Sequence, residues 1–128
     1  MIRSPPSLAD LEALAQQALA TIPEELKRHL GPVVIRLDEF PDEETEREMG
    51  LEDSFELLGL YRGVALPHQS VSSPRAGIDM IFLYRRPILD YWCETGEDLY
   101  AVVRHVLIHE IGHHFGFSDE DMERIEGA

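Results

Sequence analysis

The sequence has few cysteines, few basic residues and no long apolar run, and each shortage excludes a class of protein. Its single cysteine, Cys93, rules out an internal disulfide framework. Only 11 Lys and Arg stand against 25 Asp and Glu, which gives a formal net charge of -14. Nucleic acids and anionic membranes select basic surfaces, so we expect neither as a partner. Solubility explains the acidity, with an acidic binding surface as the alternative.

No stretch of the chain has the length and apolar character of a membrane-spanning helix. The N-terminal residues, which include Pro5 and Pro6, are not followed by the unbroken apolar region of a secretory signal peptide. We therefore expect a soluble cytoplasmic protein. With 128 residues, 44% of them hydrophobic, the chain is expected to form a single domain over residues 1–128.

The hydrophobic pattern predicts helices and short strands in mixed order. An amphipathic helix is expected from Leu8 to Leu19, capped by Ser7 or Asp10 and interrupted by Pro23. Strands are expected at 33–37, within 57–66 and at 78–84, with further helical turns at 24–30, an acidic loop with a short helix at 38–50, a connection at 67–77 and a short helix or turn at 88–93.

The longest predicted element is a helix that begins at Thr95 and ends before Gly116. Thr95 is expected to be its N-cap. Asp98 follows three residues later, so the pair resembles a capping box in which an aspartate replaces the usual glutamate. Gly116 lies where a left-handed residue commonly ends a helix. Apolar residues occur on two sides of the helix, so we expect it to be sandwiched, with His109 and His113 facing the sheet.

The end of this helix carries the pattern His-Glu-x-x-His at residues 109–113. His109 and His113 are four residues apart, so on a helix they lie one turn apart on the same face and can bind one metal ion. Glu110 is adjacent in sequence but rotated away, which suits a general base that takes a proton from a metal-bound water. Glu110 is therefore the predicted catalytic residue, and the two histidines are predicted metal ligands.

A catalytic zinc site needs a third protein ligand, and Asp119 is the predicted one. If the chain turns sharply at Gly116, the Asp119 carboxylate can reach the same ion and complete a donor set that suits Zn2+. Alternatively, Asp119 caps a last helix, a role that Ser118 can fill equally well. Asp121 and Glu123 are the reserve candidates for the third ligand, and an ion other than zinc stays possible.

Three further histidines lie near the pattern or in the predicted connection. His105 is one turn before His109 and is interpreted as a core residue or as part of the wall of a cleft around the site, with support of a metal ligand as the alternative. His114 is expected at the surface or as a partner of the negative helix end. His68 is expected to be exposed.

The arrangement His109-Glu110-x-x-His113-x-x-Gly116-x-x-Asp119 resembles the extended zinc signature of the metzincin side of the zincin metallopeptidases. The run His-Glu-Ile-Gly-His-His-Phe-Gly-Phe-Ser-Asp is similar to a minimal zincin-like family of bacterial metallopeptidases. The resemblance implies an α+β, zincin-like fold, with a small twisted mixed sheet packed against helices and a C-terminal active-site helix. It also implies that residues 78–84 form an edge strand that aligns a peptide.

By the same resemblance, His109, His113 and Asp119 would bind Zn2+, and Glu110 would act as the base in hydrolysis of a peptide or protein substrate, with short or flexible peptides favoured. Metzincins usually have a third histidine and a methionine turn well downstream, and Asp119 and the nearby Met122 depart from that pattern. The alternative function is a non-catalytic zincin-like module that binds metal or protein. Glu110 favours the enzyme, because a structural metal site has no need of a base. The sequence does not indicate an oligomeric state.

Overall fold

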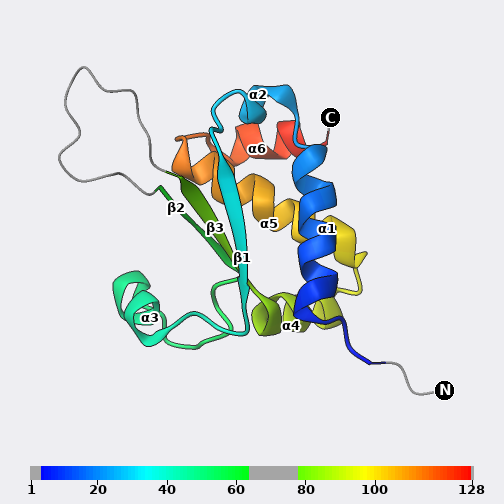
Figure 1. Cartoon of the computed structure of the whole chain (residues 1–128), viewed down its shortest axis with the longest axis vertical. Coiled ribbons are helices and arrows are strands. Elements are labelled where there is room, and N and C mark those ends of the chain that lie inside the picture. The colour runs from blue at the N-terminus through cyan, green and yellow to red at the C-terminus, as the bar shows by residue number, and fades with distance from the viewer. Residues whose placement is uncertain (1–3, 64–77, 128) are drawn as a thin grey trace.

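The computed structural model describes residues 4–63 and 78–127, which form helices around a three-stranded sheet (Figure 1). In chain order the elements are α1 (Leu8–Ala20), α2 (Glu24–Lys27), β1 (Val33–Asp38), α3 (Glu43–Met49), β2 (Gly59–Arg62), β3 (Asp79–Tyr84), α4 (Arg85–Thr95), α5 (Leu99–His114) and α6 (Asp119–Glu126). The predicted α+β class is therefore confirmed. The predicted connection at 67–77, with His68, lies outside the described residues.

β3 is the central strand of the sheet, whose order is β1-β3-β2. β1 runs parallel to it, with Val33 opposite Asp79, and β2 runs antiparallel, with Gly59 opposite Leu83. The expectation that residues 78–84 form a substrate-aligning edge strand is therefore wrong. Most of β3 is apolar, as expected for a strand paired on both sides, and among the described residues the sheet edges are β1 and β2.

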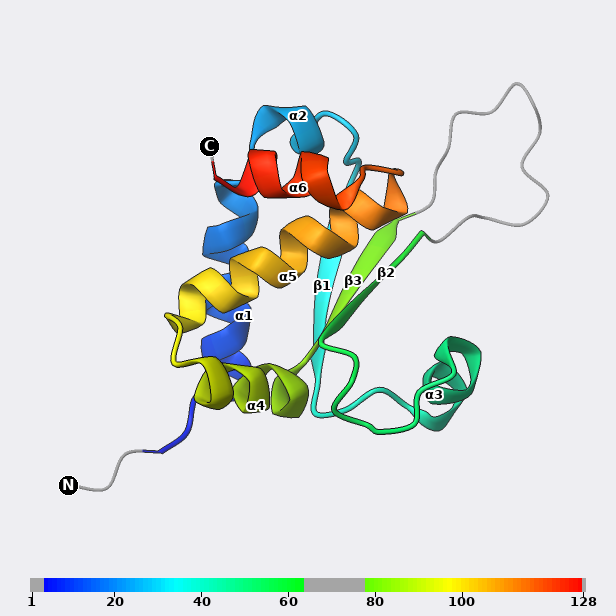
Figure 2. The same ribbon diagram turned by 180° about the vertical axis from the view of Figure 1, so that it is seen from behind.

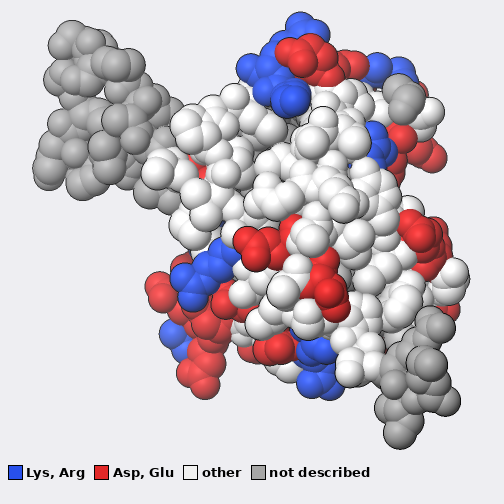
Figure 3. Space-filling view, turned by 45° about the vertical axis from the view of Figure 1, so that its right-hand side comes forward, with Lys and Arg blue, Asp and Glu red and all other residues white. Residues whose placement is uncertain are grey.

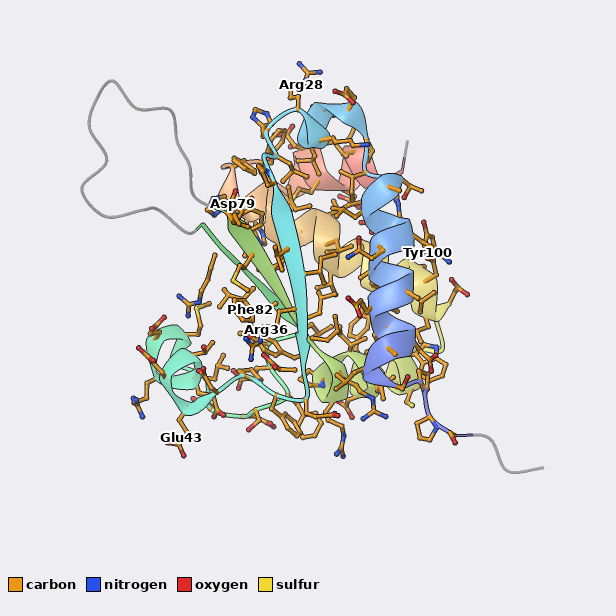
Figure 4. All side chains as sticks on the ribbon, viewed as in Figure 1. Arg28, Arg36, Glu43, Asp79, Phe82 and Tyr100 are labelled. Atoms are coloured by element: carbon orange, nitrogen blue, oxygen red, sulfur yellow. The ribbon has the colours of Figure 1, made fainter. Side chains whose placement is uncertain are left out.

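One face of the sheet carries the core. Ile35, Ile81 and Tyr61 lie in register across the three strands and are all buried. α1 and α5 pack on each other and on this face, α1 against β1 and α5 against β2 (Figures 1 and 2). On the opposite face, Arg36 and Phe82 lie toward α3 and line a hollow with its side chains (Figure 4).

α5 is the sandwiched helix that the sequence predicts, although it starts later than expected. Its fully or almost fully buried residues are Val102, Val103, Val106, Leu107, Ile108, Ile111 and Gly112. Thr95 is not its N-cap, because α4 continues to Thr95 and ends in Gly96 at a φ of 69°. Asp98 caps α5 instead, and its carboxylate accepts a hydrogen bond from the backbone N–H of Ala101 at 3.1 Å.

The acidic residues do not form one continuous patch on the face seen in Figure 3, where basic side chains lie among them. Asp38 pairs with Arg36, Glu39 with Arg85 and Glu48 with Arg62. None of the helices in the described parts of the chain is long and apolar enough to cross a membrane.

α5 reaches the edge strand β2 at Gly59, where the side chain of Val106 lies close to the strand backbone. A Cβ atom at Gly59 would lie 2.7 Å from Cγ1 of Val106 and 3.0 Å from the carbonyl oxygen of Phe82. Both neighbours are fixed, one in the core and one in the sheet backbone, so neither can move away cheaply. The absence of a side chain at Gly59 therefore sets how closely α5 lies on the edge of the sheet.

Replacing Gly59 with alanine should destabilise the fold by about 1–3 kcal/mol, because the added methyl group overpacks this contact. Gly31→Ala is the matched control, since a Cβ atom there meets nothing within 4 Å. Its free energy of unfolding should stay within about 0.5 kcal/mol of the original. Urea denaturation of both variants measures the difference, and equal stability of the two would contradict the close approach.

Candidate metal centre

A tight turn after α5 brings the last helix back to it. Phe115 is the C-cap residue of α5, and Gly116 follows with a φ of 81°, a left-handed conformation that favours glycine. The backbone N–H of Phe117 then donates to the carbonyl oxygen of Gly112 at 2.8 Å. The predicted turn at Gly116 is thus present, and it points the chain back along the helix it has left.

α6 runs back along α5, as Figure 2 shows from the α5 side. The two helices meet closely where the fully buried Met122 covers Gly112. A Cβ atom at Gly112 would lie 2.2 Å from the sulfur of Met122. Gly112 is one of the two variable positions within His-Glu-x-x-His, so this small residue allows α6 to pack directly against the helix that carries the predicted ligands.

The turn places Asp119 beside His113. Nε2 of His113 lies 3.2 Å from Oδ1 of Asp119, and donor atoms of His109, His113 and Asp119 all lie within 4.8 Å of one another. The structure assigns the N-cap role to Ser118, whose hydroxyl accepts a hydrogen bond from the backbone N–H of Asp121 at 3.1 Å. The capping alternative for Asp119 is therefore wrong, and its carboxylate is 88% exposed.

The reserve candidates are less well situated. Asp121 completes the capping box with Ser118, and its carboxylate accepts a hydrogen bond from the Ser118 backbone N–H. Neither Asp121 nor Glu123 belongs to a possible metal-binding group within the described residues.

The geometry of this group suits zinc. Ligand atoms at about 2.0–2.2 Å from a tetrahedral ion are about 3.3–3.6 Å apart, close to the spacing between His113 and Asp119. The remaining separations between donor atoms of the group lie within 4.8 Å. Burial lowers the pKa of His109, with further lowering by His105, and this favours the neutral imidazole that a metal ion requires.

Glu110 lies on a different side of α5 from these ligands and is half-buried. Its carboxylate accepts a hydrogen bond from the backbone N–H of Tyr61, on the edge strand β2. Burial raises the pKa of Glu110 to about 7, although His113 and the Tyr61 N–H oppose the increase. Glu110 and His109 both line a pocket of about 250 Å³, together with Leu57, Leu58 and other residues. The carboxylate therefore meets both the edge strand and an open pocket.

Tyr61 also contacts His114. The His114 and Tyr61 rings are stacked, with centroids 4.0 Å apart, and the Tyr61 hydroxyl donates a hydrogen bond to the buried Asp79, which is labelled in Figure 4. His114 thus belongs to the contact between α5 and the sheet. The expectation that His113 faces the sheet is wrong, because this side chain is exposed and pairs with Asp119 of α6. His109 pairs with Glu126 of α6 and also lines a pocket with Gly59 of β2.

His105 contacts a carboxylate that the sequence interpretation did not single out. Nδ1 of His105 lies 2.7 Å from Oε2 of Glu126, and Nε2 of His109 lies 3.5 Å from Oε1 of the same residue. These three side chains form a second group with donor atoms within 4.8 Å of one another. The sequence does contain a signal for Glu126 as a partner of these histidines. Glu126 is seven residues after Asp119, so on a helix the two carboxylates lie on the same face.

The roles of Ser118 and Asp119 can be separated by unfolding experiments in the presence of a chelator. Ser118→Ala should lower the free energy of unfolding by about 1 kcal/mol, because it removes the N-cap of α6. Asp119→Asn should change it by no more than about 0.5 kcal/mol, with Glu120→Gln as the exposed control. A loss from Asp119→Asn as large as that from Ser118→Ala would mean that Asp119 stabilises the helix itself.

Comparison with known proteins extends the similarity beyond the motif. A family model described as a zincin-like metallopeptidase matches residues 30–128. The structure is similar to that of a conserved hypothetical protein from T. thermophilus, with a TM-score of 0.56 and 26% sequence identity. That similarity covers 85% of this chain and 94% of the other. A search of curated proteins found no match. The family match agrees with the observed small mixed sheet and implies a metal, typically zinc.

Proposed function

The chain belongs to the zincin-like metallopeptidase family, and from this premise we propose that it is a zinc-dependent peptidase. The observation that carries the proposal is the position of Glu110. Its half-buried carboxylate lies on the helix that also carries His109 and His113, and it borders a pocket without joining a ligand group of the described residues. A metal site that only stabilised the fold would have no use for such a carboxylate.

In this proposal His109, His113 and Asp119 hold the ion, and the spacing of their donor atoms supports this set. The donor set, two imidazoles and one carboxylate, is typical of zinc and leaves room for solvent and substrate. When bound, zinc supplies Lewis acidity that activates water and polarises a substrate carbonyl group.

Glu110 is the proposed general base. Its raised pKa of about 7 means that the carboxylate can take a proton from the attacking water near neutral pH and return it afterwards. The Tyr61 N–H fixes the position of the carboxylate through a hydrogen bond from the sheet backbone. The proton then passes from the Glu110 oxygen to the nitrogen of the leaving amine as the peptide bond breaks.

The proposed substrate is a peptide. Tyr61 belongs to the edge strand β2, and its backbone N–H points away from β3 toward Glu110. An extended peptide added along this edge would pass the carboxylate, so β2 replaces β3 as the proposed aligning strand. The pocket of about 250 Å³ beside Glu110 has Leu57, Leu58 and Val106 in its lining, which suits one apolar side chain of the substrate.

Zinc binding tests the proposed ligand set. His113→Ala should weaken zinc binding by at least about 10- to 100-fold, because it removes a direct ligand. His114→Ala is the matched control, a neighbouring histidine that stacks on Tyr61 and belongs to neither metal-binding group. Its zinc affinity should equal that of the unchanged protein in isothermal titration calorimetry. Equal affinity of all three proteins would mean that the strongest zinc site of the chain does not use His113.

Catalysis is tested separately by Glu110→Gln. This change should lower the rate of peptide hydrolysis by about 10²- to 10⁴-fold, because it removes the proton acceptor. Zinc affinity should stay unchanged, since Glu110 is not a proposed ligand. Digestion of a peptide library, analysed by mass spectrometry, gives the rate, and Glu56→Gln, in the lining of the same pocket, is the control. If zinc-loaded protein and Glu110→Gln are equally inactive, the chain is a non-catalytic metal-binding module.

A further inference from the structure

α5 carries three histidines at successive turns, and α6 supplies carboxylates at both ends of this row. Because α6 runs back along α5, its first residue meets His113 and its last residue meets the region of His105 (Figure 2). The proposed peptidase uses only one end of the row, with Asp119. The other end, with Glu126, has the same chemical composition of two imidazoles and one carboxylate.

The distances within the second group are those of a site that an ion can enter. Oε1 of Glu126 lies 3.5 Å from Nε2 of His109, which matches the spacing of about 3.3–3.6 Å between ligands of a tetrahedral zinc ion. Nδ1 of His105 is closer, at 2.7 and 2.9 Å from the two carboxylate oxygens, and needs to move back by only about half an ångström.

The charge of the Glu126 carboxylate also favours a cation. Its side chain is only 26% exposed, and within residues 4–63 and 78–127 it forms no salt bridge with a lysine or arginine. The nearby guanidinium of Arg104 donates to the backbone carbonyl oxygen of Glu126, at 3.4 Å, and not to the carboxylate. A divalent ion shared with the two imidazoles would supply the positive charge that no lysine or arginine of the described residues gives this partly buried carboxylate.

We propose that His105, His109 and Glu126 form a second position for a divalent transition-metal ion such as Zn2+. His105 and His109 both line the pocket beside α5, and their side chains are 45% and 25% exposed, so an ion has a route from solvent. The position shares only His109 with the proposed catalytic site and makes no use of Glu110. An ion bound to Nε2 of His109 here competes for that residue, so the second position limits how much metal the first can hold.

The experiment removes the first position and asks whether metal still binds. His113 and Asp119 are 56% and 88% exposed, so a His113→Ala, Asp119→Ala double variant should keep the fold, which circular dichroism verifies. Titration of this variant with Zn2+, and with Co2+ monitored by its visible absorption, should give one ion per chain. Adding Glu126→Gln or His105→Ala should weaken that binding by at least about 10-fold. Adding Glu123→Gln, on the same helix, should leave it unchanged.

The opposite account is that Glu126 only accepts a hydrogen bond from His105. The double variant would then bind neither ion in the titration, or would bind with an affinity that Glu126→Gln leaves unchanged, and either result overturns the second position. The single variant His113→Ala, titrated in the same way, provides an independent background if the double variant is unstable. Since the readout is metal binding without the first ligand set, its failure leaves the peptidase proposal untouched, and loss of peptidase activity leaves the second position untouched.

Discussion

The contact between Met122 and Gly112 sets the distance between α6 and α5, and the candidate metal chemistry depends on that distance. A Cβ atom at Gly112 would overlap the sulfur of Met122, so either this fully buried side chain or α6 would have to shift. With α6 held close, Asp119 and Glu126 both reach histidines on the neighbouring helix. A packing detail between the two histidines of the motif thereby determines which carboxylates can act as ligands.

A second close approach, on the other side of α5, determines the surroundings of the base. Gly59 allows Val106 to lie against the backbone of β2, and two residues later the Tyr61 N–H reaches Glu110. α5 is thus held from two directions, by α6 on the ligand side and by β2 on the base side. This division explains how adjacent residues, His109 and Glu110, have different environments: one faces carboxylates, and the other is buried against the sheet edge, where its pKa rises.

The sequence predicted what depends on local pattern and missed what depends on pairing between distant segments. The helix, the one-turn spacing of His109 and His113 and the turn at Gly116 follow from period, motif and glycine chemistry, and the structure contains all three. The strand at 78–84 was correctly located from its pattern, but the family resemblance wrongly implied an edge position. Strand order depends on long-range pairing that periodicity does not contain. The contact of Glu126 with two histidines was missed for the same reason, since it requires α6 to be docked along its whole length.

The two ends of the row formed by His105, His109 and His113 also differ in how far apart in sequence the paired residues are. His113 and Asp119 are six residues apart, and the turn at Gly116 lies between them. His105 and Glu126 are 21 residues apart, and Glu126 is the last residue of α6, where helices fray. What holds it is its neighbour Ile125, which is buried with Met122 and contributes about 1.5–3 kcal/mol of hydrophobic stabilisation. The local pair therefore depends on the turn and on the close contact of α6 with α5 at Gly112, whereas the distant pair also needs the apolar face of α6 to be packed as far as Ile125.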